Sequence, residues 1–268
     1  MSPLERAALF LAIPLLLPLA GCVSTAEPSK DYQTLWDRGT YELVDKKDFA
    51  AARSTFRQLL DRYPQGPLNL DARLFLADCE FELGNDAEAR KLREQVAKEA
   101  TSSEIRVRAL SGLGLQELIR ENFPAAERDF GEAAKLEPDP RSRALLIARR
   151  GIALQRAGRF AEARDLYRQA AALGPGSRGD RMAKAQMVFP DYFYVQAGAY
   201  GEEANAERQR KALAEKGFQA EVTPVDTVRG KLFLVRVGRF GDRASAKALA
   251  QKLRDAKAIS GTDMGVRP

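Results

Sequence analysis

The chain has 268 residues, of which 45% are hydrophobic and 30% are charged, and its formal net charge is +6. The basic residues are interspersed with acidic ones, which argues against a nucleic-acid-binding protein, because such proteins concentrate lysine and arginine in one stripe. There is no histidine, which excludes histidine-activated nucleophiles and histidine metal ligands. The length allows one large or two modest domains.

An apolar run over residues 7–19 follows an arginine and is shorter than the roughly 20 residues of a membrane-spanning helix. It ends on a Leu-Ala-Gly triplet before Cys22, which predicts a signal peptide over residues 1–21. These four residues resemble a bacterial lipobox, and the resemblance implies lipidation of Cys22. Val23 resembles the residue that follows the cysteine in lipoproteins exported to the outer membrane. An ordinary secretory signal or a buried helix is the alternative.

We therefore expect a periplasmic chain held at the outer membrane by lipids on Cys22, with residues 22–30 as a tether. Several acyl chains on one cysteine suit stable anchoring, because a single chain binds a membrane only marginally. Once Cys22 is lipidated, Cys79 has no intramolecular partner, so no disulfide framework is expected. Cys79 lies in an apolar helical stretch and is interpreted as a small buried hydrophobe.

Residues 31–175 are rich in strong helix formers, interrupted at intervals by glycine, proline and asparagine. Alanine recurs here with a period of 37 residues, and in most units an aromatic residue lies three positions before it and another four positions after it. A small residue lies twelve positions before each alanine. The alanines are Ala52, Ala89, Ala126 and Ala163, and the small residues are Thr40, Ala77, Gly114 and Gly151.

This pattern resembles tetratricopeptide repeats, whose unit is a helical hairpin with small residues where its two helices touch. The resemblance implies an all-α helical solenoid in which each hairpin buries its apolar face on the next. The second unit is the weakest, since Asp86 and Arg93 stand where other units have aromatic residues. The expected units are about 31–64, 68–101, 104–138 and 141–175.

A repeat stack of this kind usually binds a peptide or a protein on its concave surface. We therefore expect a protein partner at the repeats, which the sequence does not identify. The aromatic residues at the repeat positions are interpreted as core. Four arginines on the fourth unit form either a basic strip or a solvated charged face: Arg143, Arg149, Arg150 and Arg156.

Residues 176–189 are turn-rich and basic and are interpreted as a linker. After it, residues 195–200 recur as the similar residues 235–240, each an alternating strand that leads into an amphipathic helix. The expected domain is a β-α-β-β-α-β unit with a four-stranded antiparallel sheet and two helices on one face, which makes the chain an α+β multidomain protein. Its elements are strand 192–200, helix 202–216, strands 219–225 and 231–238, helix 242–256 and a last strand near 264–267.

Strand parity sorts the side chains of this sheet, because alternate residues face opposite sides. The expected core face carries Phe193, Val195, Ala197, Ala199, Phe233, Val235 and Val237. The expected open face carries Tyr194, Gln196, Gly198, Tyr200, Leu232, Leu234 and Arg236. Rings, an amide and an arginine suit sugars, since they stack on pyranose faces and donate to hydroxyl and acetamido oxygens.

Residues 194–200 and 234–240, with the helices that follow them, resemble a SPOR domain, a module that binds peptidoglycan. For residues 190–268 the resemblance implies a ligand made of glycan strands stripped of their stem peptides, which accumulate at division septa. Gln196 falls on the recurrent glutamine of the family, whereas Leu234 and Arg239 depart from its usual arginine and proline. The expected glycan-binding residues are Gln196, Arg236, Tyr194 and Tyr200. For Arg236 the alternative is a solvated surface charge, and for the tyrosines it is edge packing.

Together these patterns predict a non-enzymatic lipoprotein that binds peptidoglycan and recruits a protein partner, without catalytic residues, cofactor or metal. One alternative is an assembly factor for outer-membrane or secretion components, in which the repeats are primary. Another is a cell-wall hydrolase that uses paired carboxylates as acid and base. The hydrolase is less well supported, because the acidic residues are dispersed over helix surfaces among lysines and arginines.

Overall fold

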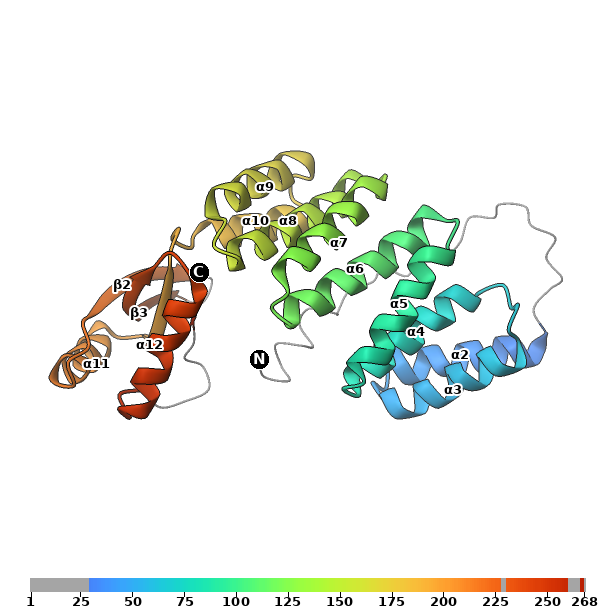
Figure 1. Cartoon of the computed structure of the whole chain (residues 1–268), viewed down its shortest axis with the longest axis horizontal. Coiled ribbons are helices and arrows are strands. Elements are labelled where there is room, and N and C mark those ends of the chain that lie inside the picture. The colour runs from blue at the N-terminus through green and yellow to red at the C-terminus, as the bar shows by residue number, and fades with distance from the viewer. Residues whose placement is uncertain (1–28, 228–229, 260–265, 268) are drawn as a thin grey trace. The chain divides into compact units, whose positions relative to one another are not determined.

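The computed structural model describes residues 29–227, 230–259 and 266–267 (Figure 1). The expected signal peptide, Cys22 and nearly all of the expected tether lie outside these residues. The chain divides into two compact units, Met1–Glu137 and Pro138–Pro268, which we describe one at a time. Within the described ranges, no helix combines the length and the apolar character needed to cross a membrane.

The described residues of the first unit form three helical hairpins in which each helix contacts the next along the chain. Each hairpin coincides with one of the units expected from the 37-residue period, although the first and third begin one residue before the expected bounds. Side-chain caps start some of these helices: Ser29 accepts a hydrogen bond from the backbone of Tyr32, and Asp48 accepts one from Ala51. The helices are α2 (Lys30–Val44), α3 (Phe49–Arg62), α4 (Asn69–Glu82), α5 (Asp86–Glu99), α6 (Ser103–Ile119) and α7 (Phe123–Leu136).

Glycines on the first helix of a hairpin admit an aromatic ring from the second. A Cβ atom on Gly114 would lie 2.8 Å from the ring of Phe130, and one on Gly39 would lie 2.9 Å from the ring of Phe56. Close packing therefore requires glycine at both positions. In the first hairpin the contact residue is Gly39, one position before the Thr40 that the period indicates.

The second hairpin places Arg93 at the aromatic position, and its side chain is only 1% exposed. The guanidinium donates to Asp78 Oδ1 at 2.7 Å and to Gln116 Oε1 at 3.1 Å, and it lies 5.5 Å from the ring centre of Phe81. Gly112 makes room for it, since a Cβ there would lie 2.8 Å from Arg93 Nε. The position is therefore part of the core even with a charged residue, because the charge is paired and hydrogen-bonded.

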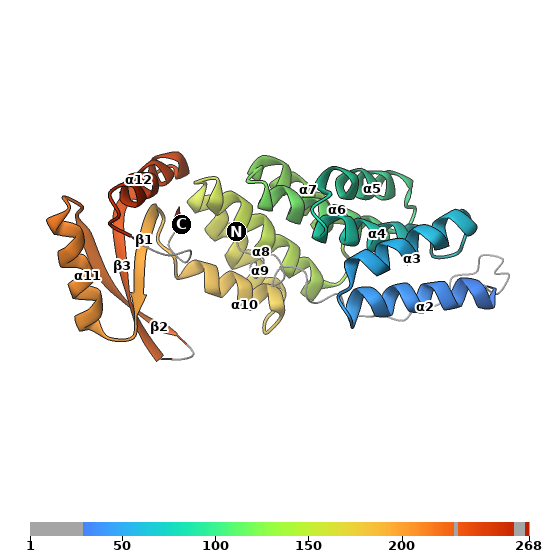
Figure 2. The same cartoon turned by 90° about the horizontal axis from the view of Figure 1, so that it is seen from below.

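The second unit begins with a fourth hairpin, α8 (Pro140–Arg156) and α9 (Phe160–Leu173). Helix α10 (Arg178–Met187) follows and packs against both, and Figure 2 shows the three helices together. Gly179 lies against the backbone of Ala144 in α8. The segment interpreted as a linker therefore contains a helix that covers the last hairpin. Its glycine-rich start is the turn before α10, which Ser177 caps.

The second unit ends in a sheet domain whose strands follow the order β2-β3-β1-β4, with every pair antiparallel. The expectation of four strands needs a correction. Three strands are long, whereas β4 has two residues and pairs only with Tyr194 and Val195 of β1. The elements are β1 (Phe193–Tyr200), α11 (Glu203–Glu215), β2 (Ala220–Thr227), β3 (Gly230–Phe240), α12 (Arg243–Asp255) and β4 (Val266–Arg267).

Both helices of this domain cover one face of the sheet. Val195 of β1 and Val235 of β3 share a buried cluster with Leu213 of α11 and Leu253 of α12. The parity expected for β3 is thus correct. Neither described helix of this domain lies on the opposite face of the sheet, which is the expected open face.

A β-bulge changes the parity of β1. Gln196 pairs with Arg236 and Gly198 pairs with Val235, so Ala197 is an extra residue on β1. Beyond the bulge, Tyr200 packs on the helix-covered core and Ala199 is exposed. The expected placements of these two residues are therefore wrong. Tyr200 lies over Gly198, where a Cβ would meet its ring at 2.5 Å.

Candidate functional site

The open face of the sheet carries a row of three polar side chains, one from each long strand. Gln196 on β1 is the direct cross-strand partner of Arg236 on β3, and Arg236 is in turn the partner of Glu221 on β2. Gln196 is half-buried, whereas Arg236 is only 9% exposed. Strand pairing thus brings together two of the four residues expected to bind glycan.

Tyr194 lies beneath Arg236. Its side chain is fully buried, and the guanidinium carbon of Arg236 lies 4.6 Å from its ring centre. This is a cation–π contact, which holds the guanidinium in place. Because the ring is covered, it is not available to stack on a sugar, and the expected role of Tyr194 as a stacking platform is wrong. The residue instead supports Arg236.

A second arginine on β3 forms an ion pair with the acidic residue of this face. Arg239 donates to Glu221 Oε2 at 2.8 Å, and its guanidinium lies 5.1 Å from the ring centre of Tyr192. The hydrogen bond with Glu221 raises the pKa of Arg239. Tyr192 also contacts Tyr194 edge to face, with ring centres 6.2 Å apart. Arg239, Glu221 and Tyr192 were not among the residues expected to bind glycan, although two arginines close to Gly238 and opposite one acidic residue are a usable signal.

Arg236 is left without an anionic partner. Its Nε atom is buried and has no hydrogen bond, and no ion pair links the residue to the part of the chain that the structure describes. The cation–π contact with Tyr194 does not use its N–H donors. A buried guanidinium with unused donors is costly unless a ligand satisfies it. Arg236 is therefore not the solvated surface charge that was the alternative, because its side chain is buried; its role in binding glycan stays a prediction.

The helices beside the sheet domain are strongly basic. Residues 138–189 contain 11 lysines and arginines against 4 aspartates and glutamates. Arg149, one of the four arginines singled out on this hairpin, is buried in α8 and is not part of an exposed strip. Burial and the neighbouring charge of Arg178 lower its pKa to about 10, so it stays positively charged at neutral pH.

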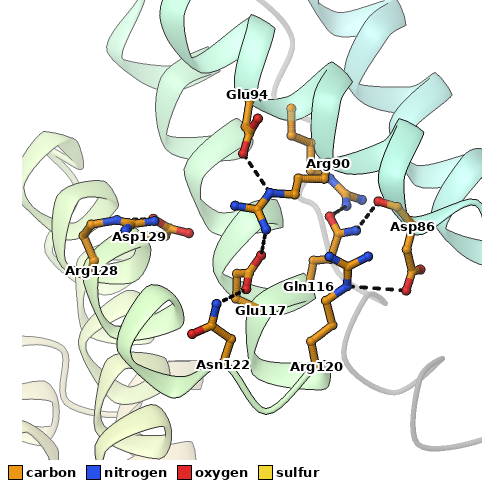
Figure 3. A network of polar contacts seen from close by, with 10 residues as sticks. Asp86, Arg90, Glu94, Gln116, Glu117, Arg120, Asn122, Arg128 and Asp129 are labelled. Atoms are coloured by element: carbon orange, nitrogen blue, oxygen red, sulfur yellow. Dashed lines mark hydrogen bonds and ion pairs between the residues drawn. The ribbon is translucent and has the colours of Figure 1, made fainter.

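A buried glutamate joins hairpins in the first unit (Figure 3). Glu117 on α6 is 2% exposed and accepts hydrogen bonds from Arg90 on α5 at 2.7 Å and from Asn122, just before α7, at 2.6 Å. We call this arrangement the glutamate staple. It fixes two successive hairpins to each other, because Arg90 and Glu117 belong to different ones.

The staple recurs one period earlier. Glu80 on α4 is buried and accepts from Arg57 on α3 at 2.5 Å and from Asn85 at 2.6 Å, with Arg53 also at 3.9 Å. The position one period after Glu117 is Leu154, which has no carboxylate. The staple is thus a feature of the first three units that the apolar periodicity of the sequence does not reveal.

The remaining candidate chemistry is limited. Cys79 is a buried free thiol, and burial raises its pKa to about 12, so it stays protonated. In the portion of the chain that the structure describes, no cluster of three or more histidine, cysteine, aspartate or glutamate residues is arranged to hold a metal ion. Cys79 is accordingly a packing residue.

Comparison with known families identifies both parts of the chain. Residues 190–262 match the SPOR domain, which covers the sheet domain with its two helices. The chain carries a SPOR domain. Residues 43–113 and 144–177 match tetratricopeptide repeats, the first within the hairpins of the first unit and the second over α8 and α9. Both resemblances expected from the sequence are thus confirmed, and the fold is a set of tetratricopeptide-like helices followed by a small antiparallel SPOR domain.

Comparison with solved structures finds partial matches of low sequence identity. A tetratricopeptide repeat protein from Parabacteroides merdae is 17% identical, with a TM-score of 0.49, and the match covers 59% of each chain. MamA AMB-1 is 21% identical with a TM-score of 0.42, over 59% of this chain and 83% of the other. A thermophilic repeat protein of Thermus thermophilus is 20% identical with a TM-score of 0.43, over 69% of this chain and 88% of the other. No curated protein matches the sequence.

Proposed function

We propose that this protein is a non-enzymatic lipoprotein that binds peptidoglycan through the open face of its SPOR domain, at glycan strands that have lost their stem peptides. The observation that carries the proposal is the cross-strand pair of Gln196 and Arg236 on the face opposite both helices. An amide beside a guanidinium supplies donors and an acceptor for sugar hydroxyl and acetamido groups. The SPOR match supports the same ligand class.

We further propose that lipids on Cys22 hold the chain at the periplasmic face of the outer membrane, with enrichment at division septa. The lipobox-like sequence before Cys22 and the following Val23 support this placement. The tetratricopeptide repeats would recruit a protein partner. A lipid anchor and a wall-binding domain on one chain act together, because each contact raises the local concentration of the other.

The direct test is retention of the full chain on purified sacculi before and after amidase treatment. The wild-type chain should be retained more strongly after treatment, and Gln196→Ala should weaken retention by about three- to tenfold, the effect of one or two lost neutral hydrogen bonds. Gln251→Ala on α12 is the matched control, since that glutamine is exposed on a helix away from the open face. Equal retention by wild type and Gln196→Ala would remove Gln196 from the site.

The same material tests the absence of catalysis. Sacculi incubated with the full chain should release no soluble muropeptides above a buffer control. Release that depends on the chain would replace this proposal by the hydrolase. A fluorescent fusion with and without residues 190–268 tests the septal placement, which should be lost on deletion.

A further inference from the structure

We propose that Arg236 binds the carboxylate that an amidase exposes on the lactyl group of muramic acid. In an intact strand this carboxyl group forms a neutral amide with the stem peptide. Hydrolysis of the amide leaves a carboxylate on the sugar, so each muramic acid of a stripped strand carries one negative charge. The inference rests on the proposed function and deepens it, because it gives the preference for stripped strands an electrostatic cause.

The arrangement of charges on the open face favours the binding of an anionic group from a ligand. Two arginines, Arg236 and Arg239, lie three residues apart on β3, and Glu221 on β2 is the acid that faces them. Arg239 holds that acid in a hydrogen bond of 2.8 Å. Arg236 has no carboxylate of its own among the described residues, so a carboxylate from a ligand would complete the pairing.

The burial of Arg236 makes such a contact strong and selective. Hydrogen bonds between a guanidinium and a carboxylate are charge-assisted, often bidentate and stronger where water is excluded. Arg236 is 9% exposed, and Tyr194 fixes its guanidinium at 4.6 Å from the ring centre, so little side-chain freedom is lost on binding. A neutral amide at the same place offers no charge to pair with it.

Gln196 completes the recognition of the sugar. It is the cross-strand partner of Arg236 and is half-buried, so its amide is available to the oxygens next to the lactyl group. One muramic acid would thus meet a neutral hydrogen-bonding group and a charged one on adjacent strands.

The experiment compares two glycan preparations on the full chain. The first is strands released from amidase-treated sacculi, and the second is the same strands after conversion of the lactyl carboxylates to alcohols by carbodiimide and borohydride. The wild-type chain should bind the carboxylate form about tenfold or more tightly, as expected for one charge-assisted hydrogen-bonded pair. The difference should shrink as salt is raised.

Variants assign the preference to Arg236. Arg236→Gln should bind both preparations with the affinity that the wild type shows for the reduced one, and Arg236→Lys should retain part of the preference. Arg254→Gln on α12 should behave as wild type, because that arginine is exposed on the helix side of the domain. Circular dichroism confirms that each variant is folded.

The outcomes separate this inference from the proposed function. Equal wild-type affinity for the two preparations overturns the inference alone, and this comparison needs no variant to fold. A preference that survives in folded Arg236→Gln also overturns it. Failure of the wild type to bind either preparation overturns the proposed function as well.

Discussion

The rings of Phe160 on α9 and Phe193 on β1 have their centres 5.1 Å apart, at an interplanar angle of 57°. Phe193 was expected in the core of the sheet domain, and it is fully buried, but its ring contacts the last helical hairpin. An ion pair reinforces the contact, since Arg164 donates to Asp191 at 2.6 Å. The SPOR domain is thus attached to the fourth hairpin through packed side chains within one unit.

This attachment predicts that the two phenylalanines are energetically coupled. Phe193→Ala should lower the free energy of unfolding by about 3–5 kcal/mol, because it leaves a cavity. A double-mutant cycle with Phe160→Ala should give a coupling energy of about 0.5–1.5 kcal/mol, as aromatic pairs do. The measurement is urea unfolding of the full chain, and strictly additive losses would contradict the coupling.

The glutamate staple predicts that removal of its buried glutamate lowers the free energy of unfolding more than removal of a surface glutamate does. Glu117→Ala removes the acceptor of Arg90 and Asn122, so the free energy of unfolding should fall by about 1–3 kcal/mol. This loss is smaller than that for a fully buried ion pair, because Arg90 is half-exposed. Glu88→Ala is the control, because the side chain of Glu88 is 44% exposed and lies 3.7 Å from Lys91, and such a surface pair is worth about 0–1 kcal/mol. Equal losses in the two variants would show that the staple adds no stability.

Asp129 on α7 predicts a pH dependence. Its side chain is buried, and burial raises the pKa of the carboxyl above its ordinary value of 3.8, although Arg128 opposes the rise. Because the folded state holds this proton more tightly than the unfolded state, stability falls as the pH rises from 3.8 through the raised pKa. Asp129→Asn lacks this fall, so the free energy of unfolding of the variant should rise relative to that of the wild type as the pH increases from 3.8 through the raised pKa.

Denaturant unfolding of both proteins at several pH values measures that gain. Asp165→Asn is the control, since Asp165 is exposed and pairs with Arg168 on the same helix. A constant difference between Asp129→Asn and wild type across the range would contradict the raised pKa.

The sequence by itself determined the classes of structure and their order along the chain. Helical periodicity, the small residues such as Gly114 and the duplicated strand–helix pattern are local signals, because burial of one face repeats with the period of the element. The resemblance to two families followed from the same residues. The placement of Gln196 and Arg236 on one face also followed, since Gln196 precedes the bulge of β1 and Arg236 alternates with the buried Val235 and Val237 of β3.

The tertiary structure decided which side chains on that face are free. The bulge at Ala197 depends on the register against β3, which no count along β1 reveals, and it moved Tyr200 into the core. Tyr194 is covered because Arg236, from a strand forty residues away, lies on its ring. Pairing between distant charges likewise made Arg93 a core residue and left Arg236 without an acidic partner among the described residues. Polar side chains find partners across the fold, and only the arrangement in space shows which of them have none.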